Sequence, residues 1–363
     1  MVCPGFIDVH VHVYEWVTNF GVLADDAGVH AGITTVIDQG STGAWTFGGF
    51  KAHVIDKSRT DVRASVSINL AGALKGGMAG DILHNPGIAS VEEVVKLKAQ
   101  HPRDVVSIKC HAESGSFSLW ETSVLAMAAQ AGRETGMPLY VHTGELFPVL
   151  EDRRPAPQAV LPGFLPHLKP GDMLAHIYSC MPDGIMSIHA DVPAVVFEAH
   201  KRGIHFDIGH GINFSFAIAR RMMDKGVFPY TVGSDAHGDF NAFHDDSKLD
   251  YSMLGAINKL LALGMPLLDV IGCATWNAAR WMGADHEIGA LRPGMRADLT
   301  LLDRVQGDWV LTDAMQERLT VKERLVPRLV VRAGEVIEPH RRYLRDVCSA
   351  TPRQAAQAAG SRQ

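Results

Sequence analysis

The chain has 363 residues, with 34 Lys and Arg against 40 Asp and Glu (a net charge of −6), and 47% of its residues are hydrophobic. This composition excludes a disordered protein, which would have fewer apolar residues and a larger net charge. It disfavours a nucleic-acid partner, which requires a concentrated basic face. We find no uninterrupted apolar run of about 18 residues and expect no membrane span. The N-terminus lacks the basic and apolar regions of a signal peptide.

Five cysteines lie far apart in the chain, and none forms a CxxC pair. This spacing disfavours a disulfide framework or a zinc knuckle. A reducing compartment suits such cysteines, so the predicted location is cytoplasmic.

Short apolar runs rich in β-branched residues alternate with helical patterns over the first two thirds of the chain. The predicted strands are 6–11, 34–38, 64–70, 105–109, 139–142, 173–177, 204–208 and 230–233. The predicted helices are 91–99, 123–135, 192–202 and 216–225. Strands that alternate with helices indicate a parallel sheet, and eight such units match the size of a (β/α)8 TIM barrel. A doubly wound open sheet is the alternative.

The pattern changes after Trp281, where 288–302 and 329–338 are typical of short strands joined by Gly-containing turns. We therefore expect three parts: an α/β barrel over 1–285, a small β appendage over 286–345 and a mobile tail over 346–363. The tail is rich in Ala, Gln, Ser and Arg and has no periodic apolar face.

Polar side chains stand at the ends of the predicted strands, which is where the chemistry of a TIM barrel takes place. They are His10 and His12 of strand 1, Lys109 of strand 4, His142 of strand 5, His176 of strand 6 and Asp235 of strand 8. Burying so much polarity is costly without compensation, and imidazoles with carboxylates suit zinc and similar divalent ions. An ammonium would repel a metal, so we infer that Lys109 reacts with carbon dioxide to form a carbamate that bridges two metals.

Several segments together resemble the amidohydrolase superfamily, from Cys3 to Glu338. The segments are 4–12 with its His-x-His pair, 32–35, 289–294 and 297–299. Segments 207–211, 214–216 and 234–238 are similar to its amidohydrolase/deacetylase, or dihydroorotase-like, branch. The resemblance implies that His10, His12, Lys109 and Asp235 hold the more buried metal. It also implies that Lys109, His142 and His176 hold the second metal.

The sequence departs from this family pattern at its N-terminus and at Tyr14. Relatives begin with a longer segment that supplies strands to the small domain. Either Met1 is not the true start or the appendage is incomplete, and an unpaired sheet edge would favour a homo-oligomer. Dihydroorotases carry an Arg at the position of Tyr14, where it binds the substrate carboxylate, so Tyr14 disfavours that activity.

The expected reaction is hydrolysis of an ester or amide, as in a deacetylase, on a small carboxylate-bearing substrate. A metal-bridged hydroxide would attack the carbonyl carbon, and Asp235 would hold its proton and pass it to the leaving group. His210 is expected to contact substrate or the oxyanion, and Asn213, His237 and Tyr14 are further candidates for substrate binding. The alternatives are a cyclic-amide hydrolase, a nucleobase deaminase, which Lys109 disfavours, and a non-catalytic scaffold on the same fold.

Overall fold

We describe the protein from a computed structural model, for residues 1–74, 85–186, 191–238 and 252–339. The predicted mobile tail, 346–363, lies outside these residues.

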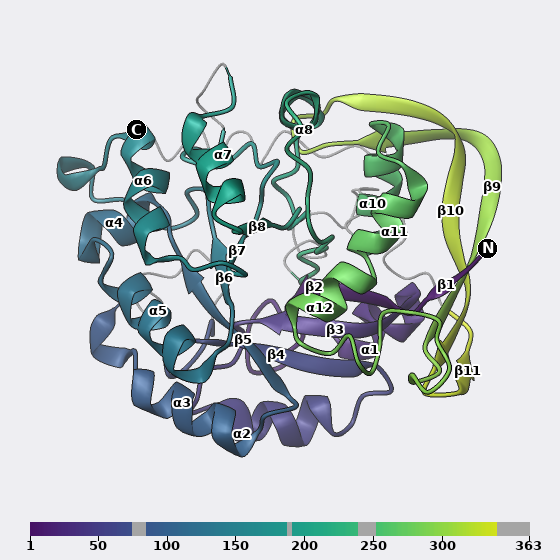
Figure 1. Ribbon diagram of the computed structural model, residues 1–363, viewed down its shortest axis with the longest axis horizontal. Coiled ribbons are helices and arrows are strands. Elements are labelled where there is room, and N and C mark those ends of the chain that lie inside the picture. The colour runs from purple at the N-terminus through teal and green to yellow at the C-terminus, as the bar shows by residue number, and fades with distance from the viewer. Residues whose placement is uncertain (75–84, 187–190, 239–251, 340–363) are drawn as a thin grey trace.

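A parallel sheet forms the centre of the molecule, with its strands paired in chain order from β2 to β8 (Figure 1). The strands are β2 (Phe6–Val11), β3 (Ile33–Gln39), β4 (Asp61–Ser67), β5 (Val105–His111), β6 (Leu139–His142), β7 (Met173–Leu174) and β8 (His205–Phe206). Every residue of β2, β3, β4 and β6 is buried, as expected for strands that are covered on both faces. Two of the predicted strands, 6–11 and 139–142, match the observed bounds.

The predicted eighth strand, 230–233, forms isolated bridges instead of a continuous ladder. Thr231 bridges Asp207 beyond the end of β8, and Ala236 bridges Val11 of β2, both in parallel orientation. Between these bridges, the backbone N–H of Asp235 donates to the carbonyl of His10 at 2.7 Å. The segment therefore closes the curled sheet and confirms the predicted barrel.

Helices surround this sheet, with α3 below β4 and β5 and α5 to the left of β5 in the view of Figure 1. The helices are α1 (Ala24–Ala27), α2 (Phe47–Phe50), α3 (Val91–Gln100), α4 (Ser114–Trp120), α5 (Ser123–Thr135), α6 (Pro157–Phe164), α7 (Ala194–Lys201), α8 (Phe216–Asp224), α10 (Met253–Ala262), α11 (Leu267–Cys273) and α12 (Trp276–Trp281). The α5 helix begins and ends as predicted, and Gly136 ends it in the left-handed conformation that glycine adopts without strain.

The appendage is an antiparallel sheet in the order β1-β9-β10-β11. Its core is a hairpin of two long strands, β9 (Leu299–Thr312) and β10 (Arg318–Arg332), which runs along one edge of the molecule (Figure 1). The short strand β11 (Glu335–Ile337) pairs with β10. The first strand, β1 (Val2–Pro4), comes from the N-terminus and pairs with β9. The chain before the barrel therefore supplies one strand of this sheet.

A buried network of charges joins the start of β4 to the segment that leads into β9. The Asp61 carboxylate lies 2.9 Å from Arg63 Nη2 and 2.8 Å from Arg296 Nη1. Arg296 also contacts Asp298 at 2.6 Å and Glu287 at 2.7 Å. Burial alone would raise the pKa of Asp61, but Arg63, Arg296 and the nearby Arg103 lower it to about 2. This network lies at the N-terminal ends of the strands, the face that stabilises a barrel.

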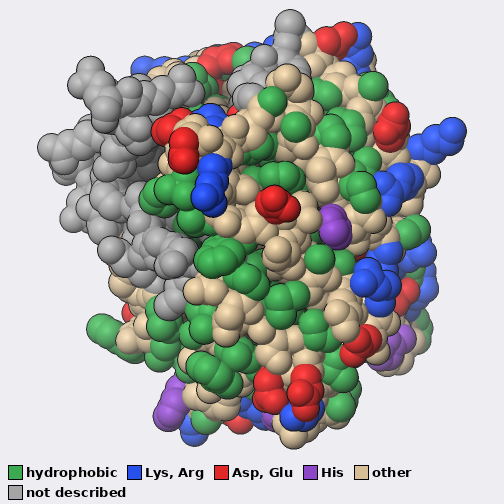
Figure 2. Space-filling view, turned by 90° about the vertical axis from the view of Figure 1, so that its left-hand side faces the viewer, with side chains coloured by type: hydrophobic (Ala, Val, Ile, Leu, Met, Phe, Trp, Pro, Cys, Tyr) green, Lys and Arg blue, Asp and Glu red, His purple; other side chains and the backbone are tan. Residues whose placement is uncertain are grey.

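No helix among the described residues is long and apolar enough to cross a membrane. The face shown in Figure 2 carries hydrophobic side chains interspersed with charged groups of both signs.

Candidate metal centre

His10, His12 and Asp235 converge at the end of β2, where the closing segment meets it. Asp235 Oδ1 lies 3.1 Å from His10 Nε2 and 3.4 Å from His12 Nε2. One possible ligand atom from each of the three buried residues lies within 4.8 Å of the others, a group that could hold a metal ion. Burial, together with the charge of Lys109, holds the pKa of His10 well below its usual value. Burial lowers the pKa of His12 to about 3, so both imidazoles are neutral and have a lone pair to offer a metal.

His142 and His176 form a second pair at the ends of β6 and β7. His142 Nδ1 lies 2.9 Å from His176 Nε2. The other nitrogen of each ring donates to a backbone carbonyl: His142 Nε2 to Gly144 at 3.1 Å and His176 Nδ1 to Gly209 at 2.7 Å. These outer bonds place the lone pairs of the two inner nitrogens towards each other. The rings of His10 and His176 are 5.4 Å apart, so the two groups adjoin.

Lys109 lies fully inside the barrel on β5 and is 2% exposed. Its Nζ is 4.8 Å from the centroid of the Tyr140 ring. Burial lowers the pKa of Lys109 to about 8, although Asp235 and other nearby carboxylates oppose this shift. A larger fraction of Lys109 is therefore neutral in the folded protein than would be neutral in water at the same pH. Only a neutral amine reacts with carbon dioxide.

The backbone is strained at two of these positions. His176 and Asp235 have φ values of 62° and 54°, in the left-handed region that residues other than glycine rarely adopt. Gly209 and Gly211 pack against the two residues, and a Cβ on Gly209 would lie 2.7 Å from His176 Nδ1. A Cβ on Gly211 would collide with the Asp235 carboxylate. Strain of this kind persists where the surroundings fix it, typically at functional sites.

Hydroxyl groups contact the outer nitrogens of His10, on β2, and of His12, the residue directly after β2. His10 Nδ1 lies 2.8 Å from the Tyr140 hydroxyl, and His12 Nδ1 lies 3.1 Å from Ser41 Oγ. All four imidazoles therefore have one nitrogen bound outward and the other turned towards the carboxylate of Asp235 or towards another imidazole. An apolar core would not require this arrangement, but a metal site does, because its ligands need partners that fix their orientation. The residues present fit divalent metal ions.

Four further residues were predicted to bind substrate, and their surroundings in the structure differ. His210 is buried, with its Nε2 2.8 Å from Lys259 Nζ of α10. Asn213 is also buried, and its Nδ2 lies 3.4 Å from His176 Nδ1. The His237 ring is 5.9 Å from the His12 ring, and burial lowers the pKa of His237 to about 4. Asn213 and His237 thus adjoin the predicted metal ligands.

Tyr14 points elsewhere. Its hydroxyl donates to the carbonyl of Thr46 at 3.0 Å, and its ring packs against Phe50 at 5.0 Å. In this arrangement, the hydroxyl lies against the loop after β3. The role of Tyr14 in substrate binding stays a prediction.

Comparison with known proteins agrees with this geometry. The model of the amidohydrolase family matches residues 1–337. The chain belongs to the amidohydrolase family. Divalent metal binding is general in this family, and the His10–His12–Asp235 group of this amidohydrolase has a matching donor set.

Several proteins that are similar to this chain over nearly its whole length are hydrolases. A deacetylase of Agrobacterium fabrum is 26% identical over 341 residues, which cover 94% of this chain and 79% of the relative. A deacetylase of Enterococcus faecalis is 26% identical over 93% of this chain and 86% of its own. Among solved structures, a dihydroorotase has a TM-score of 0.81 at 26% identity, covering 96% of this chain and 86% of that one. The amidohydrolase described here is a hydrolase that acts on small molecules.

Two residues that contact the predicted site of this amidohydrolase were not predicted from the sequence: Tyr140 contacts the predicted ligand His10, and Lys259 contacts the predicted substrate-binding residue His210. Tyr140 stands two residues before His142, and this spacing, which places both side chains on one face of a strand, was the available signal. Lys259 contacts His210 from α10, and no local pattern marks it. Asp207, directly after β8, accepts a hydrogen bond from the Tyr140 hydroxyl at 2.6 Å.

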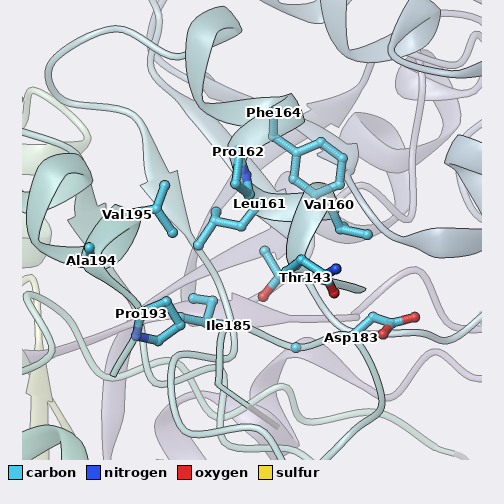
Figure 3. Close-up of a pocket in the computed structure, with 12 residues that line it drawn as sticks. Thr143, Val160, Leu161, Pro162, Phe164, Asp183, Ile185, Pro193, Ala194 and Val195 are labelled. Carbon is cyan, nitrogen blue, oxygen red and sulfur yellow. The ribbon is translucent and has the colours of Figure 1, made fainter. Parts of the chain in front are cut away.

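A pocket of about 200 Å³ lies between α6 and α7, beside Thr143 and Asp183 (Figure 3). Apolar side chains such as Leu161, Phe164 and Ile185 form much of its wall. Neighbouring residues of an extended chain point to opposite sides. His142 faces His176, so Thr143 faces outward and the pocket lies outside the ring of predicted ligands.

Proposed function

We propose that this amidohydrolase is a deacetylase-like enzyme that uses two divalent metal ions to cleave an ester or amide bond of a small carboxylate-bearing substrate. The observation that carries the proposal is the convergence of His10, His12, Asp235, His142 and His176, with every imidazole fixed from outside. The curated relatives named as deacetylases, at 26% identity over more than 90% of this chain, support the acyl substrate class.

The ligand assignment is part of this proposal. His10, His12 and Asp235 would hold one ion, and His142 and His176 would hold the other. Lys109, as a carbamate, would bridge them, and zinc is the first candidate metal. When bound, such ions lower the pKa of a water and polarise the substrate carbonyl. The proposal retains residues 1–285 as the catalytic barrel, except for β1, which pairs with β9 of the appendage. It retains 286–345 as the β appendage, of which 340–345 lie outside the described residues.

The chain's own residues would position the substrate and move the proton. Asp235 Oδ1 lies among the ligand nitrogens and would hold the proton of the attacking water and then pass it to the leaving atom. Asn213 and His237 lie beside the ligands and would contact the acyl substrate. His210 Nε2 contacts Lys259 Nζ, so His210 would fix the position of the chain that follows β8, beside the site.

A nucleobase deaminase is a second candidate, because a solved adenine deaminase has a TM-score of 0.81 at 25% identity. A dihydroorotase matches equally well in fold. Tyr14 stands where dihydroorotases carry the Arg that binds the substrate carboxylate, and its hydroxyl, which donates to Thr46, supplies no positive charge. This difference argues against the dihydroorotase.

The test is metal content and turnover measured on one preparation expressed with zinc and bicarbonate. Acetylated hydroxy acids and amino acids would be assayed beside dihydroorotate and adenine. About two metals per chain and hydrolysis of an acetyl substrate is the expected result. Turnover of adenine or dihydroorotate alone would move the enzyme to one of the other activities, and absence of tightly bound metal would contradict the metal site.

A further inference from the structure

We infer that Tyr140 is a positioning residue for the proposed metal centre: its hydroxyl connects His10 Nδ1 to the Asp207 carboxylate and thereby keeps His10 Nε2 as a metal ligand. The inference rests on the metal site proposed above. It concerns a residue that no motif marks and that itself supplies no ligand atom to a metal.

The three side chains form a continuous buried chain. The Tyr140 hydroxyl lies 2.8 Å from His10 Nδ1 and 2.6 Å from Asp207 Oδ2. Tyr140 and Asp207 are 0% exposed, and His10 is 1% exposed. The rings of His10 and Tyr140 meet edge to face at 5.0 Å. Bulk water therefore does not reach this chain of hydrogen bonds.

The carboxylate of Asp207 fixes the direction of these hydrogen bonds. Oδ2 accepts from the Tyr140 hydroxyl and from the backbone N–H of Gly209 at 2.7 Å. Oδ1 accepts from Thr231 Oγ1 at 2.6 Å and from the backbone N–H of Gly233 at 2.9 Å. The carboxylate therefore accepts two bonds at each oxygen, and the single hydroxyl hydrogen of Tyr140 points to it. The hydroxyl oxygen can then only accept from His10 Nδ1–H.

This direction determines the tautomer of His10. With its proton on Nδ1, the ring carries its lone pair on Nε2, the atom 3.1 Å from Asp235 Oδ1. The link also joins two strands of the barrel, because Tyr140 lies on β6 and His10 on β2. Since Tyr140 precedes His142 by two residues, one strand end supplies both a ligand and the group that orients another ligand.

The substitution Tyr140→Phe removes the hydroxyl and keeps the ring. A matched control is Tyr178→Phe, because Tyr178 is also 0% exposed and its hydroxyl is also hydrogen-bonded within the core, to the carbonyl of Val227 at 3.1 Å. Zn²⁺ affinity would be measured by competition with a chromogenic chelator. Loss of an outer partner of a metal-binding histidine typically lowers metal affinity by roughly 10–100-fold. We expect that loss in Tyr140→Phe and none in Tyr178→Phe.

A second measurement reads the tautomer directly in the metal-free protein. Nitrogen-15 spectra of the histidine side chains should show His10 protonated on Nδ1 in the wild type and a mixture of tautomers in Tyr140→Phe. Equal Zn²⁺ affinity in wild type and Tyr140→Phe, or an equal loss in both Tyr variants, would overturn the proposed role of Tyr140 but not the metal site. A wild type that binds no metal would overturn the metal site and this inference together.

Discussion

His142 Nδ1 and His176 Nε2 lie 2.9 Å apart, and the N–H at the other nitrogen of each ring donates a hydrogen bond to a backbone carbonyl. If both rings are neutral, two lone pairs face each other in a buried space. Protonation of one ring would remove the conflict, but burial lowers the pKa of His176 to about 4. A divalent cation resolves it at neutral pH, which is why this pair indicates a metal more strongly than either residue alone.

Removal of one imidazole from this pair should therefore remove one metal. We expect His176→Ala to lower the metal content from about two ions per chain to about one, as measured by elemental analysis after dialysis. The control is His205→Ala, which removes a histidine that stacks on Tyr230 with 3.8 Å between ring centroids, away from the ligands. Full metal content in His176→Ala would contradict the assignment of the second metal.

Asp235→Asn should abolish most turnover while much of the metal remains bound. The amide keeps an oxygen that can serve as a ligand, but it cannot hold and release the proton. General acid–base catalysis typically contributes roughly 10²–10⁴-fold, so we expect kcat to fall by that factor. The measurement is kcat with metal content determined on the same sample. An Asn variant with near-normal kcat would refute the role of Asp235 in proton transfer.

Metal loading should depend on pH through Lys109. The pKa of this lysine is lowered to about 8, so the fraction of neutral amine in the metal-free protein rises as the pH increases from 6.5 to 8.5, roughly as a single titrating group would. Since only the neutral amine forms a carbamate, bicarbonate should promote metal loading more at the upper end of this range. Lys109→Ala should lose the bicarbonate effect. Loading that needs neither bicarbonate nor Lys109 would exclude the carbamate.

Gly211→Ala should disturb the site more than the fold. Its φ is 36°, and a Cβ there would collide with the Asp235 carboxylate. Gly226 is the matched control, because it has a φ of 80° and no atom within 4 Å of the added Cβ. Both substitutions should cost about 1–2 kcal/mol of stability for the left-handed backbone. Only Gly211→Ala should also lose metal affinity, and an equal metal affinity in both variants would show that Gly211 does not shape the site.

The Asp61 network should make stability depend on acid pH. Because the folded-state pKa of Asp61, about 2, lies below its usual 3.8, the stabilisation is present above pH 4 and is lost as the pH falls towards 2. That shift corresponds to about 2 kcal/mol. Asp61→Asn should lower the free energy of unfolding in urea at pH 7 by at least that amount, and by less at pH 3. An equal loss at both pH values would mean that packing, not charge, is what Asp61 contributes.

The alternation of buried strands with helices can be predicted from the sequence alone. The barrel and its order of strands follow from that alternation. It also determined the ligand candidates, because strand ends that carry His10, Lys109 and His142 are readable from local apolar runs. The segment that supplies Asp235 closes the barrel through isolated bridges, which local propensity indicates only weakly. Its position depends on pairing with β2, more than two hundred residues earlier in the chain.

The orientation of the predicted ligands, by contrast, depends on contacts that form only in the folded protein. The hydrogen bond from Tyr140 to Asp207 joins β6 to the end of β8, and the His10 bond joins β6 to β2, so no window of sequence contains them. The same holds for Tyr14, whose hydroxyl lies against Thr46, and for Lys259, which reaches His210 from α10. Hydrophobic periodicity is a local property of the chain, whereas the tautomer and direction of a buried side chain depend on partners that folding brings from distant strands.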